Sequence, residues 1–127
     1  MHKRRAAETA PRLEARVRAL ALPEGRSVGT PGHDAARAQL TEALQEAGLE
    51  PYGEAFALTY RERGLDFANL IGVAPGRNRT APPVLIGAHY DTAGAMPGAD
   101  DNAAAVAIAL EVAERLVGSL AERDVLI

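Results

Sequence analysis

The chain has 127 residues, of which 47% are hydrophobic and 24% are charged, and its formal net charge is -3. This composition is that of a single globular domain, and it excludes extensive disorder except near the ends of the chain. The small negative charge gives no reason to expect a nucleic acid or an anionic membrane as a partner. The sequence contains no cysteine, so disulfides and thiolate metal sites are excluded, and any metal would have to bind to His, Asp and Glu.

The sequence predicts neither a transmembrane helix nor a signal peptide. No apolar run approaches the roughly 20 residues that a membrane-spanning helix needs. The basic start of the chain is followed by Ala6–Thr9 and not by an apolar core, as a signal peptide requires. We therefore expect a soluble and, by default, cytoplasmic chain, and the sequence leaves open whether a longer parent enzyme is exported.

Two helices are predicted in the first part of the chain, after a flexible N-terminus over residues 1–10. Apolar residues at helical spacing place the first helix from about Pro11 to Leu22. The second helix follows the turn-rich run Gly29–Gly32 and ends before Gly48, a natural C-terminal cap. His33, at the start of this helix, is expected to lie on the surface. The expected buried face consists of Ala35, Ala36, Leu40, Ala43, Leu44 and Ala47.

From Pro51 onward the apolar residues alternate with a period of two, which predicts strands. The first is a half-buried strand, followed by a polar turn at 61–64 and a hairpin partner over 67–73. After a polar loop, the continuous apolar run Val84–Ala88 predicts a strand that is covered on both faces. The aromatic residues expected in the core of this region are Tyr52, Phe56 and Tyr60.

A third helix is predicted from about Asn102 to Leu116, and the final run Val125–Ile127 is typical of the first half of a central strand. Strand, helix and strand in this order predict a right-handed parallel unit. We predict a three-layer α/β/α fold with a mixed, mostly parallel sheet over residues 11–127. Because the chain stops inside an apolar strand, we expect a fragment whose unpaired edge at 125–127 favours self-association.

Two short motifs flank a loop of small residues, Gly87-Ala88-His89-Tyr90-Asp91-Thr92 and Pro97-Gly98-Ala99-Asp100-Asp101-Asn102. The first places His89 at the C-terminal end of a strand, where α/β sheets bind ligands, and Asp91 can accept the other ring N–H of His89. The second places two carboxylates before a helix, whose N-terminus keeps them ionised. This donor set favours zinc, with cobalt or manganese as substitutes.

Each of these residues also has a plainer interpretation. His89 could be a packed or hydrogen-bonded histidine, Asp91 could form a turn, and Asp100 and Asp101 could cap the helix. Capping and ligation are compatible, because one carboxylate can cap while the other faces a metal. The combination of the histidine with three carboxylates favours the metal site over the plainer interpretations.

The two motifs resemble the first metal-binding region of the M28 peptidases, the aminopeptidase Y and bacterial leucyl aminopeptidase group. The resemblance extends to Gly29–Gly32 and to Asn69-Leu70-Ile71-Gly72, and it covers roughly residues 12–127. It implies that His89 ligates one of two zinc ions, that Asp101 bridges both, and that Asp91, the catalytic candidate, supports His89. It also implies a zinc-dependent aminopeptidase that hydrolyses N-terminal peptide bonds with a metal-bound hydroxide.

The resemblance further implies that a Glu-Glu pair, a later Asp and a final His complete the site in that family, and these lie beyond Ile127. We therefore expect an incomplete and inactive fragment, with metal occupancy in doubt, of an enzyme that acts on peptides. One alternative is a non-catalytic truncated or scaffold domain. Another is an M20-type amidohydrolase, but that group expects a Trp-containing segment, and this chain has no Trp. Glutaminyl cyclase, a single-zinc relative, usually lacks the Asp-Asp-Asn arrangement.

Overall fold

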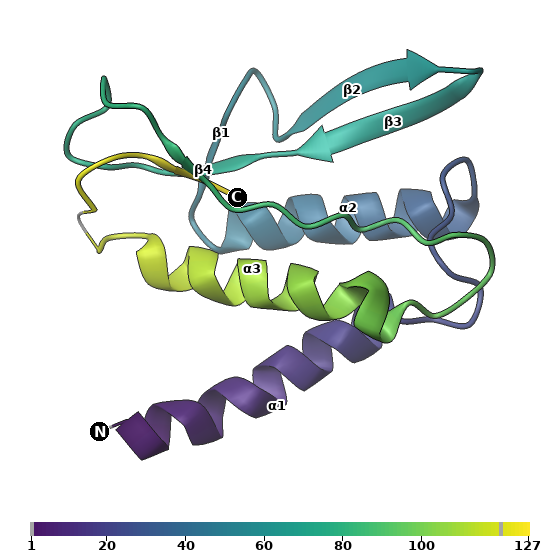
Figure 1. Ribbon diagram of the computed structural model, residues 1–127, viewed down its shortest axis with the longest axis horizontal. Coiled ribbons are helices and arrows are strands. Elements are labelled where there is room, and N and C mark those ends of the chain that lie inside the picture. Colours follow the sequence, from purple (N-terminus) through teal and green to yellow (C-terminus); the bar gives the residue numbers. More distant parts are fainter. Residues whose placement is uncertain (1, 120) are drawn as a thin grey trace.

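The computed structural model describes residues 2–119 and 121–127, in which three helices lie on one side of a small sheet (Figure 1). Met1, part of the predicted flexible N-terminus, lies outside the described residues. No helix in the described part is both long enough and apolar enough to cross a membrane. The helical elements are α1 (His2–Leu20), α2 (Pro31–Glu46), the short π-helical turn η1 (Ala99–Ala103) and α3 (Ala104–Leu116). The strands are β1 (Glu50–Pro51), β2 (Ala57–Glu62), β3 (Leu65–Leu70), β4 (Gly72–Ala74), β5 (Val84–Leu85) and β6 (Val125–Leu126).

Helix α1 begins at His2, so the start predicted at Pro11 is wrong. Proline lacks an amide N–H and fits best in the first turn of a helix, but here Pro11 lies inside the helix. The first half of α1 gains support from α3, because Arg115 donates a hydrogen bond to the hydroxyl of Thr9. The predicted flexibility of residues 1–10 is a separate property and stays a prediction.

Helices α1 and α3 are joined by an ion-pair network around the buried carboxylate of Glu111, which is 5% exposed. Arg12, Arg16 and Arg115 all donate to Glu111, and Arg12 and Arg16 also contact Glu114. Burial raises the pKa of Glu111, but the hydrogen bonds from Arg12 and Arg115 outweigh it and hold the pKa below its ordinary value. The network therefore holds α1 against α3 when the Glu111 carboxylate is ionised.

Helix α2 begins where the turn-rich run predicts, at Pro31 with Thr30 as its N-cap. The Thr30 hydroxyl accepts a hydrogen bond from the His33 N–H at 3.4 Å. His33 is 4% exposed, so its predicted surface position is wrong; its ring stacks on Tyr90, with 5.1 Å between ring centroids. Ala35 is exposed, in contrast to the prediction. The residues of α2 that are buried are His33, Ala36, Leu40 and Leu44.

The four-stranded sheet has the order β1-β4-β6-β5. Strand β4 is antiparallel to both β1 and β6, and only β5 and β6 are parallel. The predicted α/β fold with a mixed sheet is therefore correct, whereas the mostly parallel sheet is wrong for the described residues. The chain returns from β1 to β4 through a hairpin, which reverses its direction, while α3 joins β5 to β6 and permits parallel pairing. In Figure 1 the helices all lie below the sheet, so the predicted helical layer on its second face is not part of the described residues.

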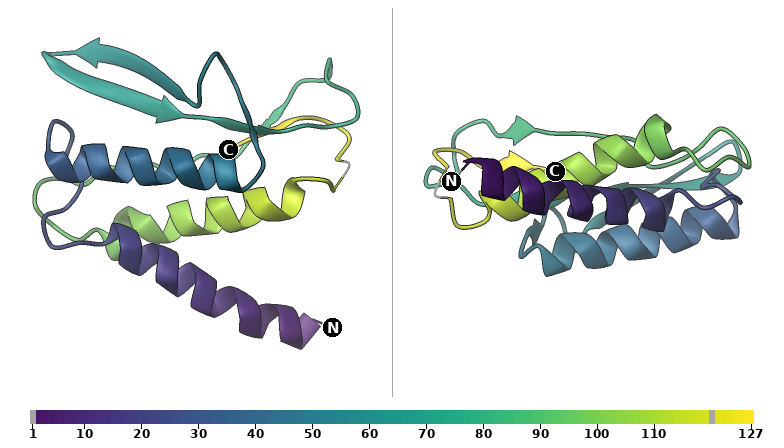
Figure 2. Two further views of the ribbon diagram at one scale, coloured as in Figure 1. Left: turned by 180° about the vertical axis from the view of Figure 1, so that it is seen from behind. Right: turned by 90° about the horizontal axis from the view of Figure 1, so that it is seen from below.

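Strands β2 and β3 form the predicted hairpin, paired from Ala57↔Leu70 to Glu62↔Leu65. Figure 2 shows this hairpin as an arm that extends beyond the sheet. Tyr60 on β2 stacks on Phe67 of β3, with 5.2 Å between ring centroids. Tyr52 and Tyr60 are 57% and 48% exposed, so their predicted position in the core is wrong. The alternation of apolar residues indicates the strands. It does not show that the hairpin extends beyond the sheet and the helices that would cover its side chains.

The last two strands differ most from the prediction. Val84 and Leu85 of β5 are exposed, so the predicted cover on both faces is wrong. The described helices lie on one side of the sheet (Figure 1), and β5 is its edge strand. Val125 of β6 is buried and β6 is hydrogen-bonded on both sides, to β4 and β5. The unpaired edge predicted at 125–127 is therefore not present, and self-association stays a prediction without that support.

The hydrophobic core lies between the three helices and the sheet. Helix α3 contributes Val106, Leu110 and Ala113, and Phe56 packs partly buried against this core as predicted. The other buried members of the core are Leu20, Ala36, Leu40, Leu44, Leu49, Ala74, Ala103 and Val125. Helix α3 contacts both α1 and α2, so it connects the other two helices.

Replacing Glu111 with Gln should lower the free energy of unfolding by about 1.5–3 kcal/mol near neutral pH, the usual contribution of hydrogen bonds to a charged group. Because the folded-state pKa of Glu111 is depressed, its contribution is present above the unfolded-state pKa and is lost as the pH falls through the folded-state pKa. Urea denaturation of both proteins from about pH 7 to about pH 3 should show the difference shrinking in acid.

The matched control is Glu14→Gln, which removes an exposed pair with Arg18 on α1. This change should lower the free energy of unfolding by no more than about 0.5 kcal/mol. Equal effects of the two substitutions, or a Glu111 effect that does not change with pH, would contradict the role assigned to the network.

Candidate metal centre

The segment that follows β5 positions His89 and Asp91 on the same side of an extended chain. Pairing with β6 fixes its start, where the Ile86 N–H donates to the Leu126 carbonyl at 2.8 Å. Tyr90 points to the opposite side, where it stacks on His33 and its hydroxyl donates to the Ala68 carbonyl. Because side chains alternate along an extended chain, the inward position of Tyr90 turns its two neighbours outward.

The second motif positions Asp101 at the start of the third helix. Gly98, with φ of +56°, begins the turn η1, and Asp101 and Asn102 have non-helical backbone angles within it. The peptide bond between Asp101 and Asn102 is cis. Helix α3 begins at Ala104, two residues after the predicted start. The Asp101 side chain is 85% exposed and faces outward ahead of the helix.

The structure brings His89, Asp91 and Asp101 together. The Nε2 atom of His89 lies 2.9 Å from Oδ1 of Asp101, and the Nδ1 atom lies 3.3 Å from Oδ1 of Asp91. The backbone oxygen of Asp91 is also 3.3 Å from this Nδ1. In the described residues His89 pairs with Asp101 and Asp91 and not with Asp100. The geometry agrees with Asp101, of the two adjacent aspartates, as the partner of His89.

The imidazole nitrogen and carboxylate oxygen in this arrangement are of the types that zinc binds in proteins. When Nδ1–H is held by Asp91, Nε2 keeps its lone pair for a metal. No group of three or more His, Cys, Asp or Glu residues in the described chain could hold a metal. These residues therefore offer two donors, and their role as ligands stays a prediction.

A residue that the sequence analysis did not identify lies beneath both motifs. Arg26 is 2% exposed, and its guanidinium donates to backbone carbonyls on each side of the loop, at Tyr90 and at Pro97 and Gly98. The main-chain N–H of Arg26 donates to the Thr92 hydroxyl at 2.7 Å. No local signal marks this residue, because a single arginine after a Pro-Glu-Gly turn is typical of a solvated loop.

Two glycines allow this close packing. A Cβ atom on Gly25 would lie 2.7 Å from the backbone oxygens of Gly94 and Met96. A Cβ atom on Gly98 would lie 2.5 Å from Thr92 Cγ2 and from the backbone oxygen of Asp101. Neither distance is possible for a real side chain, so the loop between the two motifs requires glycine at both positions.

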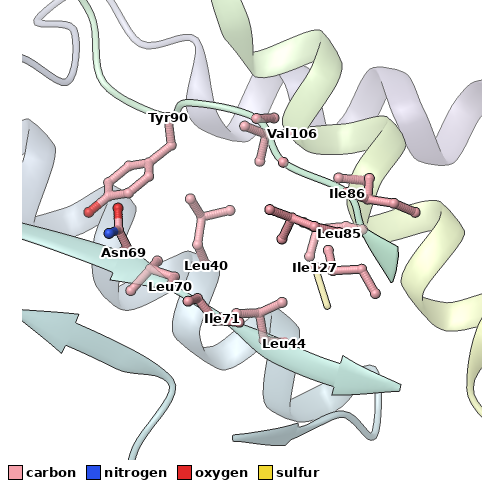
Figure 3. Close-up of a pocket in the computed structure, with 14 residues that line it drawn as sticks. Leu40, Leu44, Asn69, Leu70, Ile71, Leu85, Ile86, Tyr90, Val106 and Ile127 are labelled. Carbon is pink, nitrogen blue, oxygen red and sulfur yellow. The ribbon is translucent and has the colours of Figure 1, made fainter. Parts of the chain in front are cut away.

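An apolar cavity of about 300 Å³ lies beside the site and not within it (Figure 3). It is bounded by α2, α3, the end of β3 and the segment after β5. Tyr90 lines it, whereas His89 and Asp101 do not. The labelled lining residues in Figure 3 are Leu40, Leu44, Asn69, Leu70, Ile71, Leu85, Ile86, Tyr90, Val106 and Ile127.

Replacing Gly98 with Ala should destabilise the chain by more than the cost of a positive φ, which is about 1–2 kcal/mol for a non-glycine residue, because it also forces the Asp101 backbone to move. Gly94→Ala is the matched control in the same loop: its φ is +84°, and no heavy atom lies within 4 Å of the added Cβ. Urea denaturation should show that Gly98→Ala loses about 1–3 kcal/mol more than the control, the usual cost of overpacking. Equal losses would contradict the tight packing around Gly98.

The fold is similar to parts of several solved enzymes. A leucine aminopeptidase precursor from Bacteroides thetaiotaomicron is 21% identical over 93% of this chain and 46% of its own, with a TM-score of 0.72. A Zn-dependent exopeptidase from Parabacteroides distasonis is 22% identical over 93% of this chain and 45% of its own, with a TM-score of 0.71. A glutaminyl cyclase from Porphyromonas gingivalis is 24% identical over 93% of this chain and 44% of its own, with a TM-score of 0.70. The chain thus spans less than half the length of each. These similarities show only that the chain shares part of the zinc-exopeptidase fold.

The sequence comparisons are more specific about the family. No curated protein matches the chain in sequence. The profile of Peptidase family M28 matches residues 69–127, which include β4, β5, both motifs, α3 and β6. The match is to the M28 family and not to the M20 group that was the alternative. Residues 69–127, with His89, Asp91 and Asp101 among them, are similar to the domain of peptidase family M28.

Proposed function

We propose that this chain supplies the first metal-binding part of a zinc-dependent metallopeptidase of the aminopeptidase type. The supporting observation is the contact between His89 Nε2 and Asp101 Oδ1 at 2.9 Å, within the segment that matches the M28 family. One residue comes from the end of a strand and the other from the start of a helix, so the fold brings together two donors of the types that zinc prefers.

The three side chains have distinct parts in this proposal. His89 would bind zinc through Nε2, and Asp101 would bind it through a carboxylate that is free to bridge a second ion. Asp91 would accept a hydrogen bond from the other ring nitrogen, Nδ1, and so set the tautomer and orientation of His89. The high exposure of Asp101 leaves room for a peptide substrate. A bound zinc ion would polarise a peptide carbonyl and make a nucleophile of water at neutral pH.

We further propose that the site is completed by polypeptide outside these 127 residues. A catalytic zinc usually has three protein ligands, whereas the described residues contain no group of three. The solved enzymes with this fold are more than twice as long as the matched part. The remaining ligands and the general base would come from such additional chain, and the 127 residues alone would bind zinc weakly and lack peptidase activity.

Zinc binding by the chain, measured by equilibrium dialysis followed by metal analysis, tests this proposal. His89→Ala and Asp101→Asn should each abolish measurable binding, because each removes one of the two donors. Asp91→Asn should weaken binding by about 10–100-fold, the range usual for a residue that orients a ligand. Asp100→Asn is the control, since it makes the same charge change one residue away and should leave the Kd unchanged.

Each alternative outcome has a separate meaning. No zinc binding by the wild-type chain would contradict the metal centre and favour a scaffold domain. Loss of binding in Asp100→Asn but not in Asp101→Asn would exchange the roles of the two aspartates. Rapid hydrolysis of an aminoacyl-nitroanilide by this chain alone would show that the site is already complete. Cyclisation of N-terminal glutamine without such hydrolysis would contradict the aminopeptidase assignment.

A further inference from the structure

Arg26 is a buried cation whose contacts are unusual. Among the described residues its side chain forms no ion pair, although buried charges are usually paired with opposite charges. The guanidinium instead donates to carbonyl oxygens: Nε to Tyr90 at 2.7 Å, Nη1 to Leu20 at 2.7 Å and to Pro97 at 2.7 Å, and Nη2 to Gly98 at 3.0 Å.

These carbonyls belong to the segments that carry the two metal donors. The Tyr90 carbonyl lies between His89 and Asp91, whereas Pro97 and Gly98 begin the turn that leads to Asp101. The Leu20 carbonyl belongs to the last turn of α1, where helix carbonyls lack partners within the helix. One planar group therefore holds the end of α1, the segment after β5 and the start of η1 at fixed spacing.

The metal donors themselves have little packing to hold them. The side chains of His89 and Asp101 are 55% and 85% exposed, so apart from their contacts with each other and with Asp91 little surrounds them. The backbone beneath them is held, because the main chain of Arg26 also forms hydrogen bonds with Thr92, the last residue of the first motif. The hydrogen bonds of Arg26 therefore fix the separation of the two backbone segments that carry the donors.

We infer that Arg26 is a positioning residue of the metal centre, which sets the separation of His89 and Asp101 by binding the carbonyls of Tyr90, Pro97 and Gly98. This inference rests on the proposed function. A lysine cannot replace it, because an ammonium group lacks the planar fork that reaches carbonyls on two segments at once. Burial lowers the pKa of Arg26 and the charge of Asp91 opposes this, but a guanidinium remains protonated in proteins, so the clamp does not depend on pH.

Titration of the chain with Co²⁺, followed by visible absorption, tests this role in Arg26→Lys. The variant should bind Co²⁺ about 10–100-fold more weakly, and its absorption spectrum at saturation should change shape, because the two donors meet the ion at a different separation. The spectrum is the critical measurement, since a residue that only stabilises the fold would leave the geometry of the saturated site unchanged.

The matched control is Arg16→Lys, which changes a partly buried guanidinium in the α1–α3 network. It should lower stability while leaving the Co²⁺ affinity and spectrum unchanged. Hydrogen exchange of the amides over 89–101 provides a second measurement without metal, and it should be faster in Arg26→Lys alone. If Arg26→Lys does not fold, Thr92→Val removes the hydroxyl that accepts the Arg26 N–H and should weaken Co²⁺ binding in the same direction.

The outcomes separate this inference from the proposed function. Wild-type affinity and spectrum in folded Arg26→Lys, or in Thr92→Val where the lysine variant is unfolded, would overturn the positioning role. If the wild-type chain binds no Co²⁺, the proposed metal centre fails and hydrogen exchange decides the role of Arg26. Faster amide exchange over residues 89–101 in Arg26→Lys, or in Thr92→Val where the lysine variant is unfolded, but not in Arg16→Lys would then support the positioning role. Equal exchange rates in that variant and in Arg16→Lys would overturn it.

Discussion

The hydrogen bonds of the buried Arg26 guanidinium determine how the candidate site is assembled. A charged group that is removed from water must keep its hydrogen bonds, and here backbone carbonyls from three parts of the chain provide them. Satisfying one side chain therefore brings the end of α1, the segment after β5 and the turn η1 into contact. The contact of His89 with Asp101 at the surface is a consequence of this arrangement below it.

The same architecture explains why the donors are accessible. The hydrogen bonds of Arg26 hold the backbone that carries the donors, while the donor side chains are exposed after a strand end and before a helix start. Helix α3 connects the site to the core and to α1. The turn η1 that precedes α3 carries Asp101, the middle of α3 packs in the core, and Glu111 joins α3 to α1.

Fold and chemistry carry different information about this protein. Aminopeptidases and a glutaminyl cyclase share this part of the fold, so the architecture alone does not select a reaction. Under the proposed function, the reaction would depend on the side chains at the site, an imidazole with its supporting carboxylate on one side and a second carboxylate on the other. The M28 match over residues 69–127 covers all of these donors, which connects the chemistry to the family.

The sequence by itself determined the features that depend on neighbouring residues. Period and turn chemistry predicted the hairpin, α2, α3 and the two motifs, because these signals lie within a few residues of each other. Only the tertiary structure decided which surfaces were covered: His33 is buried because Tyr90 packs on it, and Val125 is buried because β6 has a partner on each side. Arg26 belongs to the same class, since its partners come from distant segments and no local pattern marks the carbonyls that it binds.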